Sequence, residues 1–253
     1  MDLTAAGLVL ELTHDGAVAT VTLNRPERRN AQSPGMWAGL AEIGRTLPES
    51  VRIVVLKGAG VSFSAGLDVR TFTPEGIPGE PPAMPPGVSH AELEELIARY
   101  QEGFLWLRDP RFTSIAVVQG HAIGAGFQLA LSCDLRIAAE DVKFCMKESA
   151  LGLVPDLTGT KPLVDVVGLP RALDLCLTAR TVLADEAREL RLAEKIVKND
   201  ELDAAAADLV ESLLKIDVGA ARATKALLQQ APANSLAEQT AAERRAQSKR
   251  ILG

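Results

Sequence analysis

Two glycine-rich turns contain the residues of this chain that are best suited to bind a negatively charged oxygen. The first lies in residues 120–134, where glycines spaced G-x-x-x-G-x-G follow an apolar run at 114–119 and precede a helical pattern. The second is the stretch F-S-A-G-L-D at residues 63–68, which follows a β-branched run. A glycine turn beside a strand end or a helix start leaves backbone N–H groups unpaired, and small residues let a ligand approach them closely.

If the N–H groups of Leu67 and Ala125 converge on one oxygen, the two turns form an oxyanion hole. Each donor in such a site is worth about 2.7–4 kcal/mol in known acyl-transfer enzymes. A tight strand-to-helix corner that binds nothing is the alternative, because spacing alone does not establish convergence. The glycine spacing does not fit the G-x-G-x-x-G pattern of dinucleotide-binding proteins.

A polar loop at residues 24–30 contains three arginines, Arg25, Arg28 and Arg29. They are either phosphate contacts or part of a solvated loop, and the residues alone leave both interpretations open. The net charge of −6 argues against a nucleic-acid-binding surface, which needs clustered Lys and Arg. It does not exclude a small anionic ligand held by a few local basic groups.

The composition of the chain is that of an ordinary globular protein. Its 253 residues, 47% hydrophobic and 24% charged, can bury one sizeable core. Three cysteines in apolar contexts (Cys133, Cys145 and Cys176) indicate buried thiols in a reducing compartment. The cysteines and the three histidines show no metal-ligand spacing. With neither a signal-peptide pattern nor an apolar run of about 18 residues, we expect a cytoplasmic protein without metal.

Alternating strand and helix patterns must position the two turns. Strands are expected at residues 8–12, 18–23, 51–56, 114–119, 135–139 and 142–145, with helices at 34–47 and 90–108. Residues 73–89 contain six prolines and three glycines, which predicts an irregular loop. Beyond Lys161 the pattern is nearly all helical, with helices expected at 166–179, 184–191, 201–214, 219–230 and 235–252. This order predicts an α/β protein with a helical tail.

Four motifs, in this order along the chain, resemble the crotonase superfamily of enoyl-CoA hydratases and isomerases. They are L-N-R-P at 23–26, F-S-A-G-L-D-V at 63–69, G-H-A-I-G-A-G at 120–126 with the Cys133-Asp134 pair, and G-L-V-P-D at 152–156. The resemblance implies a crotonase-like spiral of ββα units over residues 1–195, which carries an acyl-CoA site. It also implies a C-terminal helical region at 196–253 that assembles the chain into a homotrimer or a dimer of trimers. No cofactor is implied beyond the CoA moiety of the substrate.

The resemblance assigns roles to individual residues as well. It implies that the N–H groups of Leu67 and Ala125 hold the thioester oxygen, and that Ala65, Leu67 and Val69 line the path of adenine and pantetheine. The three arginines of the polar loop would lie near the CoA phosphates. Chemistry independently favours an oxyanion hole, because an enolate formed from a thioester carries its charge on the carbonyl oxygen.

The resemblance also locates the catalytic acids. Hydratases of the family use two glutamates, of which the second matches Glu148 and the first matches Gln128, which cannot ionise. We therefore expect an isomerase, in which Glu148 alone takes a proton from C2 and Gln128 points toward the same thioester. Dienoyl-CoA isomerases carry a further aspartate eight residues after the glutamate, where this chain has Asp156. They also carry an aspartate at the position of Gln128, so that match is incomplete.

Other interpretations of these residues stay open. A hydratase in which Gln128 only orients water is the second hypothesis, and a non-catalytic acyl-CoA binding or assembly protein is the third. Glu148 could instead cap a helix or pair with Lys147 or Lys161. Asp156 could be the N-cap of a helix at 158–167.

Overall fold

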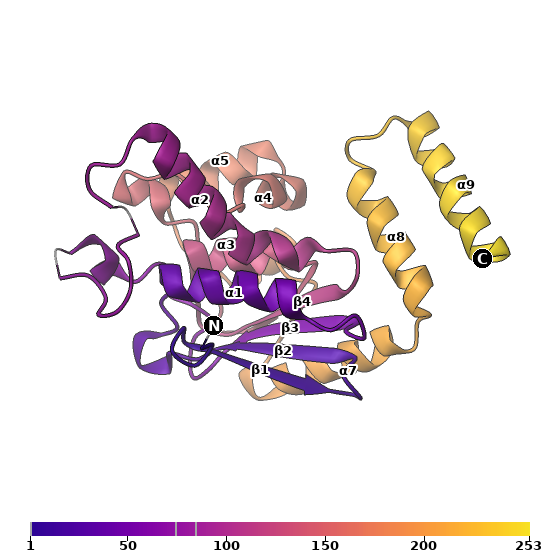
Figure 1. Ribbon diagram of the computed structural model, residues 1–253, viewed down its shortest axis with the longest axis horizontal. Coiled ribbons are helices and arrows are strands. Elements are labelled where there is room, and N and C mark those ends of the chain that lie inside the picture. The colour runs from indigo at the N-terminus through magenta and orange to yellow at the C-terminus, as the bar shows by residue number, and fades with distance from the viewer. Residues whose placement is uncertain (1, 74, 84) are drawn as a thin grey trace.

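The computed structural model describes residues 2–73, 75–83 and 85–253 (Figure 1). Two residues of the predicted irregular loop, Pro74 and Met84, lie outside the described residues. The other residues of that loop form neither helix nor strand, as expected from the prolines. No helix in the described part of the chain is both long and apolar enough to cross a membrane.

A six-stranded sheet forms the centre of the molecule, with the strand order β1-β2-β3-β4-β6-β9. Within the described residues, β1 and β2 are antiparallel neighbours in this sheet and the other pairs are parallel. The strands are β1 (Leu8–Thr13), β2 (Val18–Leu23), β3 (Ile53–Gly58), β4 (Thr113–Val118), β6 (Leu135–Ala139) and β9 (Lys195–Val197). The inner strands are continuous apolar runs because both faces of the sheet are covered by helices.

Alternate residues of each strand enter different cores. In β3, Val54 and Leu56 face the core formed with α1 (Pro34–Thr46), α2 (His90–Leu105) and α3 (Ala125–Ser132). The neighbouring residues Ile53 and Val55 face the other side, where α7 (Leu202–Leu214) lies. Figure 1 shows α1 and α7 on opposite faces of the sheet.

A smaller sheet consists of β5 (His121–Ile123), β7 (Lys143–Cys145) and β8 (Val182–Leu183). β4 lies in the large sheet, β5 in the small one, and α3 follows. β6 and β7 repeat this step and lead to the 3₁₀ helix η4 (Glu148–Leu151). The chain therefore winds between the two sheets in ββα units, and the predicted α/β class is confirmed. Gly120 lies in the loop that leads from β4 to β5.

The helical part differs from the sequence prediction in the break between α4 and α5 and in the two short strands β8 and β9. A single helix was expected at 166–179, but α4 (Thr160–Val167) ends at Gly168 and α5 (Leu169–Thr178) begins immediately after it. Gly168 has φ of +77°, a conformation that ends a helix and favours glycine. The remaining elements are α6 (Ala184–Glu189) and the 3₁₀ helices Pro26–Arg28, Val69–Phe72, Trp106–Arg108 and Asn199–Glu201.

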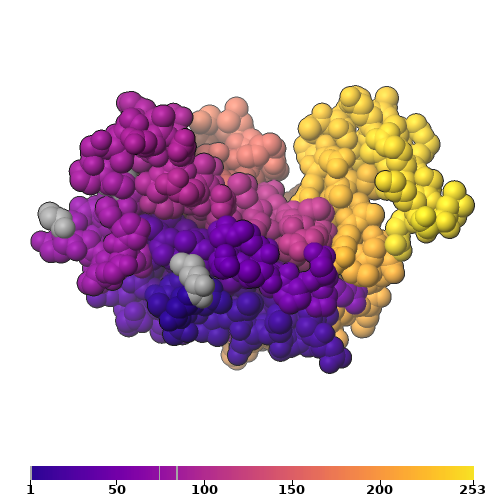
Figure 2. Space-filling model, in the orientation of Figure 1, coloured from indigo at the N-terminus to yellow at the C-terminus, as the bar shows by residue number. Residues whose placement is uncertain are grey.

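The predicted region 196–253 contains two kinds of helix. α7 packs on the central sheet through Leu202, Ala205, Ala206 and Val210. In contrast, α8 (Val218–Gln230) and α9 (Leu236–Leu252) have no buried residue. Figure 2 shows these two helices, in orange and yellow, projecting from one end of the molecule. We refer to α8 and α9 as the tail hairpin.

Candidate active site

The two glycine turns lie side by side and are joined by backbone hydrogen bonds. Ser64 N–H donates to His121 O over 2.8 Å, and Ile123 N–H donates to Ser64 O over 3.0 Å. The backbones are so close that a Cβ on Gly66 would lie 2.5 Å from Ile123 O and 3.7 Å from Ala125 N. Gly66 also has φ of +88°, so only glycine fits there without strain. The structure thus brings together the two stretches that the sequence singled out.

The predicted oxyanion-hole donors belong to these joined segments. Neither the Leu67 nor the Ala125 N–H group donates a hydrogen bond within residues 2–73, 75–83 and 85–253. On either side of Leu67 the backbone is paired, because Gln32 N–H donates to Gly66 O over 2.7 Å and Asp68 N–H donates to Gln32 O over 2.8 Å. Ala125 is the first residue of α3, where an N–H group has no acceptor within the helix. Their convergence on one ligand oxygen stays a prediction.

Glu148 lies beside the start of α3 and is only 9% exposed. Its Oε1 accepts a hydrogen bond from Gln128 Nε2 over 2.7 Å and would lie 3.1 Å from a Cβ on Gly124. Its Oε2 is buried and has no hydrogen-bond partner among the described residues. Burial raises the pKa of Glu148, although its own backbone N–H group and then the hydrogen bond from Gln128 oppose this. A carboxylate with a raised pKa is a stronger base.

The structure does not support the purely structural roles considered for Glu148 and Asp156, which were helix capping and ion pairing. Glu148 does not cap the helix that it begins, because η4 has no side-chain cap. Lys161 pairs with Asp165 rather than with Glu148. The capping interpretation of Asp156 is wrong, because α4 starts only at Thr160 and has no side-chain cap. The intervening turn separates Asp156 from the helix.

Gln128 is fully buried on α3 and makes hydrogen bonds through both ends of its amide. The amide oxygen accepts from Leu157 N–H over 2.9 Å and from Gly159 N–H over 3.1 Å, while Nε2 donates to Glu148. The side chain therefore connects Glu148 to the turn at residues 157–159.

Asp156 stands at the start of this turn and is half-buried. Its carbonyl oxygen accepts a hydrogen bond from Gln101 Nε2 of α2 over 2.6 Å. Burial raises the pKa of the Asp156 carboxyl group. In addition to burial, the charge of Asp156 raises the pKa of Glu148, so the two carboxyl groups interact.

Arg25 is held inside the protein near the Leu67 turn. Its guanidinium donates to Ala31 O over 2.6 Å and to Asp68 Oδ2 over 2.9 Å. Asp68 is only 5% exposed and also binds Arg70. The hydrogen bonds from Arg70, and then from Arg25, hold the pKa of Asp68 well below its usual range. Arg25 thus fastens the polar loop to the Leu67 turn, and its predicted phosphate contact stays a prediction.

The other residues predicted to contact CoA lie around the same loop. Arg28 and Arg29 are exposed, as is Val69, while Ala65 is half-buried. Ala65 N–H donates to Arg29 O over 2.8 Å, so the polar loop directly adjoins the Leu67 turn. Exposed guanidinium groups beside this turn are suited to bind phosphate. The contacts of these residues with CoA stay predictions.

Two buried amides that the sequence analysis overlooked support the Leu67 turn. Asn30 Nδ2 donates to Ala59 O over 2.9 Å and to Ser62 O over 2.8 Å. Gln32 Nε2 donates to Ser64 Oγ over 3.1 Å. Their proximity in sequence to L-N-R-P was the one available signal, but a polar residue in a polar loop does not predict burial.

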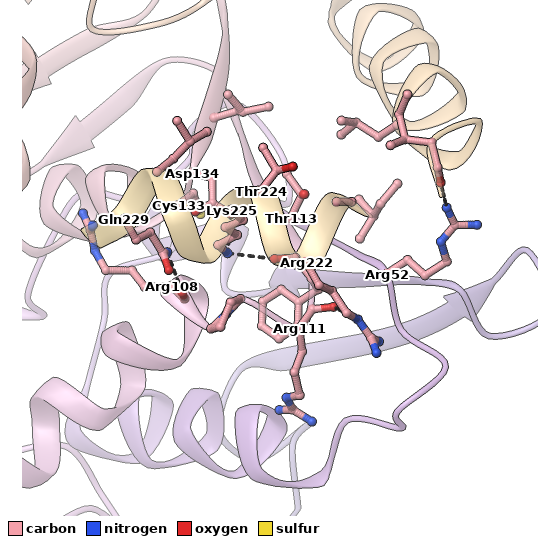
Figure 3. Close-up of a pocket in the computed structure, with 18 of the residues that line it drawn as sticks. Arg52, Arg108, Arg111, Thr113, Cys133, Asp134, Arg222, Thr224, Lys225 and Gln229 are labelled. Carbon is pink, nitrogen blue, oxygen red and sulfur yellow. Dashed lines mark hydrogen bonds and ion pairs between the residues drawn. The ribbon is translucent and has the colours of Figure 1, made fainter. Parts of the chain in front are cut away.

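A cavity of about 610 Å³ lies away from this site. It is lined by Ile53, Thr113 and Leu135, the first residues of β3, β4 and β6, whereas the glycine turns follow the last residues of β3 and β4. Figure 3 shows Arg222 and Lys225 of α8 reaching across this cavity toward the body. We call it the hairpin cavity. No group of three or more His, Cys, Asp or Glu in the described part of the chain is placed to hold a metal ion.

Comparison with known proteins identifies relatives over almost the whole chain. Residues 13–251 match the family of enoyl-CoA hydratases and isomerases. A Mycobacterium tuberculosis protein named as an enoyl-CoA hydratase is 30% identical over 91% of this chain and 85% of the relative. The human mitochondrial Δ3,5-Δ2,4-dienoyl-CoA isomerase is 34% identical over 87% of this chain and 68% of the relative. Relatives therefore carry both names.

Solved structures show the same fold. A Thermobifida fusca YX protein named as an enoyl-CoA hydratase, in complex with CoA, is 57% identical with a TM-score of 0.94 over 99% of this chain and 95% of that chain. The structure of the protein from this organism with acetoacetyl-CoA is 56% identical, with a TM-score of 0.95 over 99% and 96%. The predicted crotonase fold is confirmed by these structures.

Proposed function

This chain belongs to the enoyl-CoA hydratase/isomerase family, and on that premise we propose that it shifts a double bond along an enoyl-CoA thioester. The observation that carries the proposal is the pair Gln128 and Glu148. Only Glu148 of this pair can ionise, and the Gln128 amide holds one of its carboxylate oxygens. A single base suffices to move a proton between two carbons of one substrate.

In the proposed reaction Glu148 removes a proton from C2 of a 3-enoyl thioester. The electron pair of that C–H bond becomes part of a dienolate, whose negative charge lies on the thioester oxygen. The N–H groups of Leu67 and Ala125 stabilise this charge. Protonated Glu148 then returns the proton to C4, which gives the 2-enoyl thioester and restores the carboxylate. No metal or further cofactor takes part.

The environment of Glu148 supports its role as the base. A carboxylate of ordinary pKa is too weak to deprotonate carbon readily, and burial raises the pKa of this one. The buried Oε2 accepts no hydrogen bond in the described part of the chain, so no donor competes with the substrate for its lone pairs. Leaving such a group unpaired costs stability, which is typical of residues kept for function.

Hydration of a 2-enoyl thioester is the second candidate, favoured by the names of several relatives. It normally requires two ionisable groups, one to deprotonate water and one to protonate carbon. The amide of Gln128 already binds the 157–159 turn and Glu148, so it is poorly suited to activate water. A non-catalytic acyl-CoA binding protein is the third candidate.

A panel of 2-enoyl, 3-enoyl and dienoyl thioesters, followed by ultraviolet absorbance and mass, separates the three. Isomerisation leaves the mass unchanged, whereas hydration adds one water. Conversion of a 3-enoyl thioester without mass change is the expected result. Efficient hydration of crotonyl-CoA, about 10 per second or more, would contradict it. Binding of every thioester without turnover would indicate the third candidate.

A substitution of Asp156 tests whether the proton moves along a conjugated double-bond system. We propose that Asp156 serves only when the double-bond system is conjugated, so Asp156→Asn should spare 3-to-2 isomerisation and abolish dienoyl isomerisation. Equal loss of both activities would assign Asp156 a structural role.

We also propose that the protein is a cytoplasmic homotrimer or a dimer of trimers. All three cysteines are free thiols, which supports a reducing compartment. The tail hairpin supports self-association, because Leu228 is 67% and Leu236 is 80% exposed. Light scattering of the purified protein measures the assembly state.

A further inference from the structure

We propose that Gln128 is a positioning residue, an amide clamp that selects the reactive oxygen of Glu148 and fixes the turn carrying Asp156. The structural part of this proposal is independent of the proposed function, and only its expected effects on kinetics rest on that function. The clamp consists of four groups: the Gln128 amide, the Glu148 carboxyl group, and the backbone N–H groups of Leu157 and Gly159.

The orientation of the clamp follows from its partners. Leu157 and Gly159 both present N–H donors, so the atom they contact must be the amide oxygen. The amide nitrogen consequently faces Glu148 Oε1 and donates to it. This assignment does not depend on distinguishing nitrogen from oxygen by position alone.

The clamp makes the two oxygens of Glu148 unequal. Oε1 accepts the hydrogen bond from Gln128 over 2.7 Å, whereas Oε2 is buried with no partner in the described part of the chain. A hydrogen bond reduces the basicity of the oxygen that accepts it. Oε2 is therefore the oxygen that takes the substrate proton, and Oε1 is the one that keeps the carboxyl group in place.

The clamp also holds the turn at residues 157–159, in which Thr158 has an unfavourable backbone conformation. Thr158 is β-branched yet has φ of +71°, which costs about 1–3 kcal/mol. Its Oγ1 lies 3.0 Å from Ser132 Oγ, one helical turn beyond Gln128 on the same face of α3. A Cβ on Gly159 would lie 2.5 Å from Gln128 Cγ, so the turn fits closely against the clamp.

Asp156 is fixed by this turn. Its carbonyl is held from the other side by Gln101 of α2, while Gln128 and Ser132 of α3 hold the residues after it. Removing the Gln128 contacts should release the turn and alter the position of Asp156 relative to Glu148. The clamp thus connects the placement of both carboxyl groups to one neutral side chain.

Because Gln128 is neutral, it binds Glu148 without placing a second carboxylate against it. A glutamate would place a carboxylate oxygen where Nε2 now lies, 2.7 Å from Glu148 Oε1. Two carboxylates so close share a proton, which raises the pKa of one of them strongly. Asp156 also acts on Glu148, and Glu148 acts on Cys145 of β7 and Cys176 of α5. Lys147, the residue before Glu148, is exposed and acts on Cys145.

The test compares Gln128→Met, which keeps the volume but removes the clamp, with Gln128→Glu. Gln230→Ala, at the exposed end of α8, is the matched control. In the free protein, carboxyl ¹³C resonances report the titration of Glu148, assigned by its absence in Glu148→Gln. We expect an upward shift of about one pH unit in Gln128→Met and a larger one in Gln128→Glu. The control should titrate like the wild type.

Kinetics give the second measurement. The acidic limb of kcat/KM should move to higher pH by the same amount in Gln128→Met, because the base must be ionised, while CoA binding stays within about twofold. If the titration and the acidic limb are unchanged and activity falls only in step with Tm, Gln128 is merely a packing residue and the proposal is wrong. If the titration of Glu148 shifts but the protein has no isomerase activity, the clamp is supported and the proposed function is refuted.

Discussion

The candidate active site and the tail hairpin are attached to the same sheet in opposite ways. At the site, backbone meets backbone, and a single added Cβ on Gly66 would lie 2.5 Å from a carbonyl oxygen. At the hairpin, three polar side chains of α8 reach across the hairpin cavity to carbonyl groups of the body. They are Arg222 to Arg111 O, Lys225 to Phe112 O and Gln229 to Arg108 O, each over 2.7 Å.

The difference concerns tolerance to displacement. Short backbone contacts fix the positions of the N–H donors to within tenths of an ångström, as stabilisation of a developing charge requires. Long polar side chains can follow a helix that shifts, and they leave the apolar surface of α8 uncovered. We infer that the site is rigid before substrate arrives, whereas the hairpin can shift relative to the sheet.

The largest expected effect is the loss of catalysis in a variant that leaves the glycine turns and the tail hairpin in place. Glu148→Gln should reduce turnover about 10²–10⁴-fold with CoA binding nearly intact, because it removes the base. The exposed Glu189→Gln is the matched control. Steady-state kinetics and calorimetric titration with CoA measure both quantities, and unchanged turnover would show that the base lies elsewhere.

The same variant should be more stable than the wild type at neutral pH. The folded-state pKa of Glu148 is raised above 4.5, so the folded protein binds more protons than the unfolded chain between the two pKa values. Stability therefore falls as pH rises through that window, and Glu148→Gln removes the loss. Tm should be higher at pH 7 and equal to that of the wild type below about pH 4.5. A lower Tm at pH 7 would contradict the sign of the shift.

Two truncations sharpen the contrast within the C-terminal region. Deleting residues 217–253 removes only the tail hairpin and should leave a folded monomer. Deleting residues 197–253 also removes α7 and exposes the sheet face that includes Ile53 and Val55, so aggregation is expected. Light scattering distinguishes these outcomes, and a trimer formed without the hairpin would refute its role in assembly.

Glycine substitutions test the rigidity of the site. Gly66→Ala should lower kcat about 10²-fold or more, because relief of the contact with Ile123 O displaces the Leu67 N–H group. Gly79→Ala is the control, since Gly79 has a similar φ of +81° but nothing within 4 Å. It should cost only about 1–2 kcal/mol of local strain. Equal effects on kcat would mean that backbone conformation, not close approach, is decisive.

The smallest effect is expected from removing one connection of the hairpin. Lys225→Met leaves two carbonyl groups and Asp134 without their cation and should cost about 1–3 kcal/mol. Hydrogen exchange should accelerate in α8 and α9 but not in the glycine turns, and kcat should stay within about threefold. Lys249→Met, on the exposed end of α9, is the control. Faster exchange at residues 63–67 would show that the two regions are coupled.

The sequence predicted the strands, the turns and the α/β class because these depend on local patterns. Residues 53–58 and 113–118 are apolar runs, and the glycines after them mark the loops directly. The break at Gly168 was missed because its neighbours continue the apolar helical pattern. β5, β8 and β9, of two or three residues each, are too short to have a period.

The contacts that complete the site join residues too distant in sequence to be inferred from spacing. Arg25 and Asp68 are 43 residues apart, and Gln128 reaches Leu157 and Gly159 over 29 and 31 residues. The left-handed conformation of Thr158 contradicts its own preference and exists only because the surrounding structure imposes it. Local rules cannot predict such a residue.

The Leu67 and Ala125 donors are main-chain atoms, and this has a genetic consequence. In the proposed mechanism no exchange other than one to proline deletes either donor, so an alanine scan would not detect the two N–H groups that stabilise the charge. Only proline, or an ester introduced in place of the amide, removes the hydrogen itself. The side chains at positions 67 and 125 can therefore change to suit different acyl groups while the two N–H donors remain.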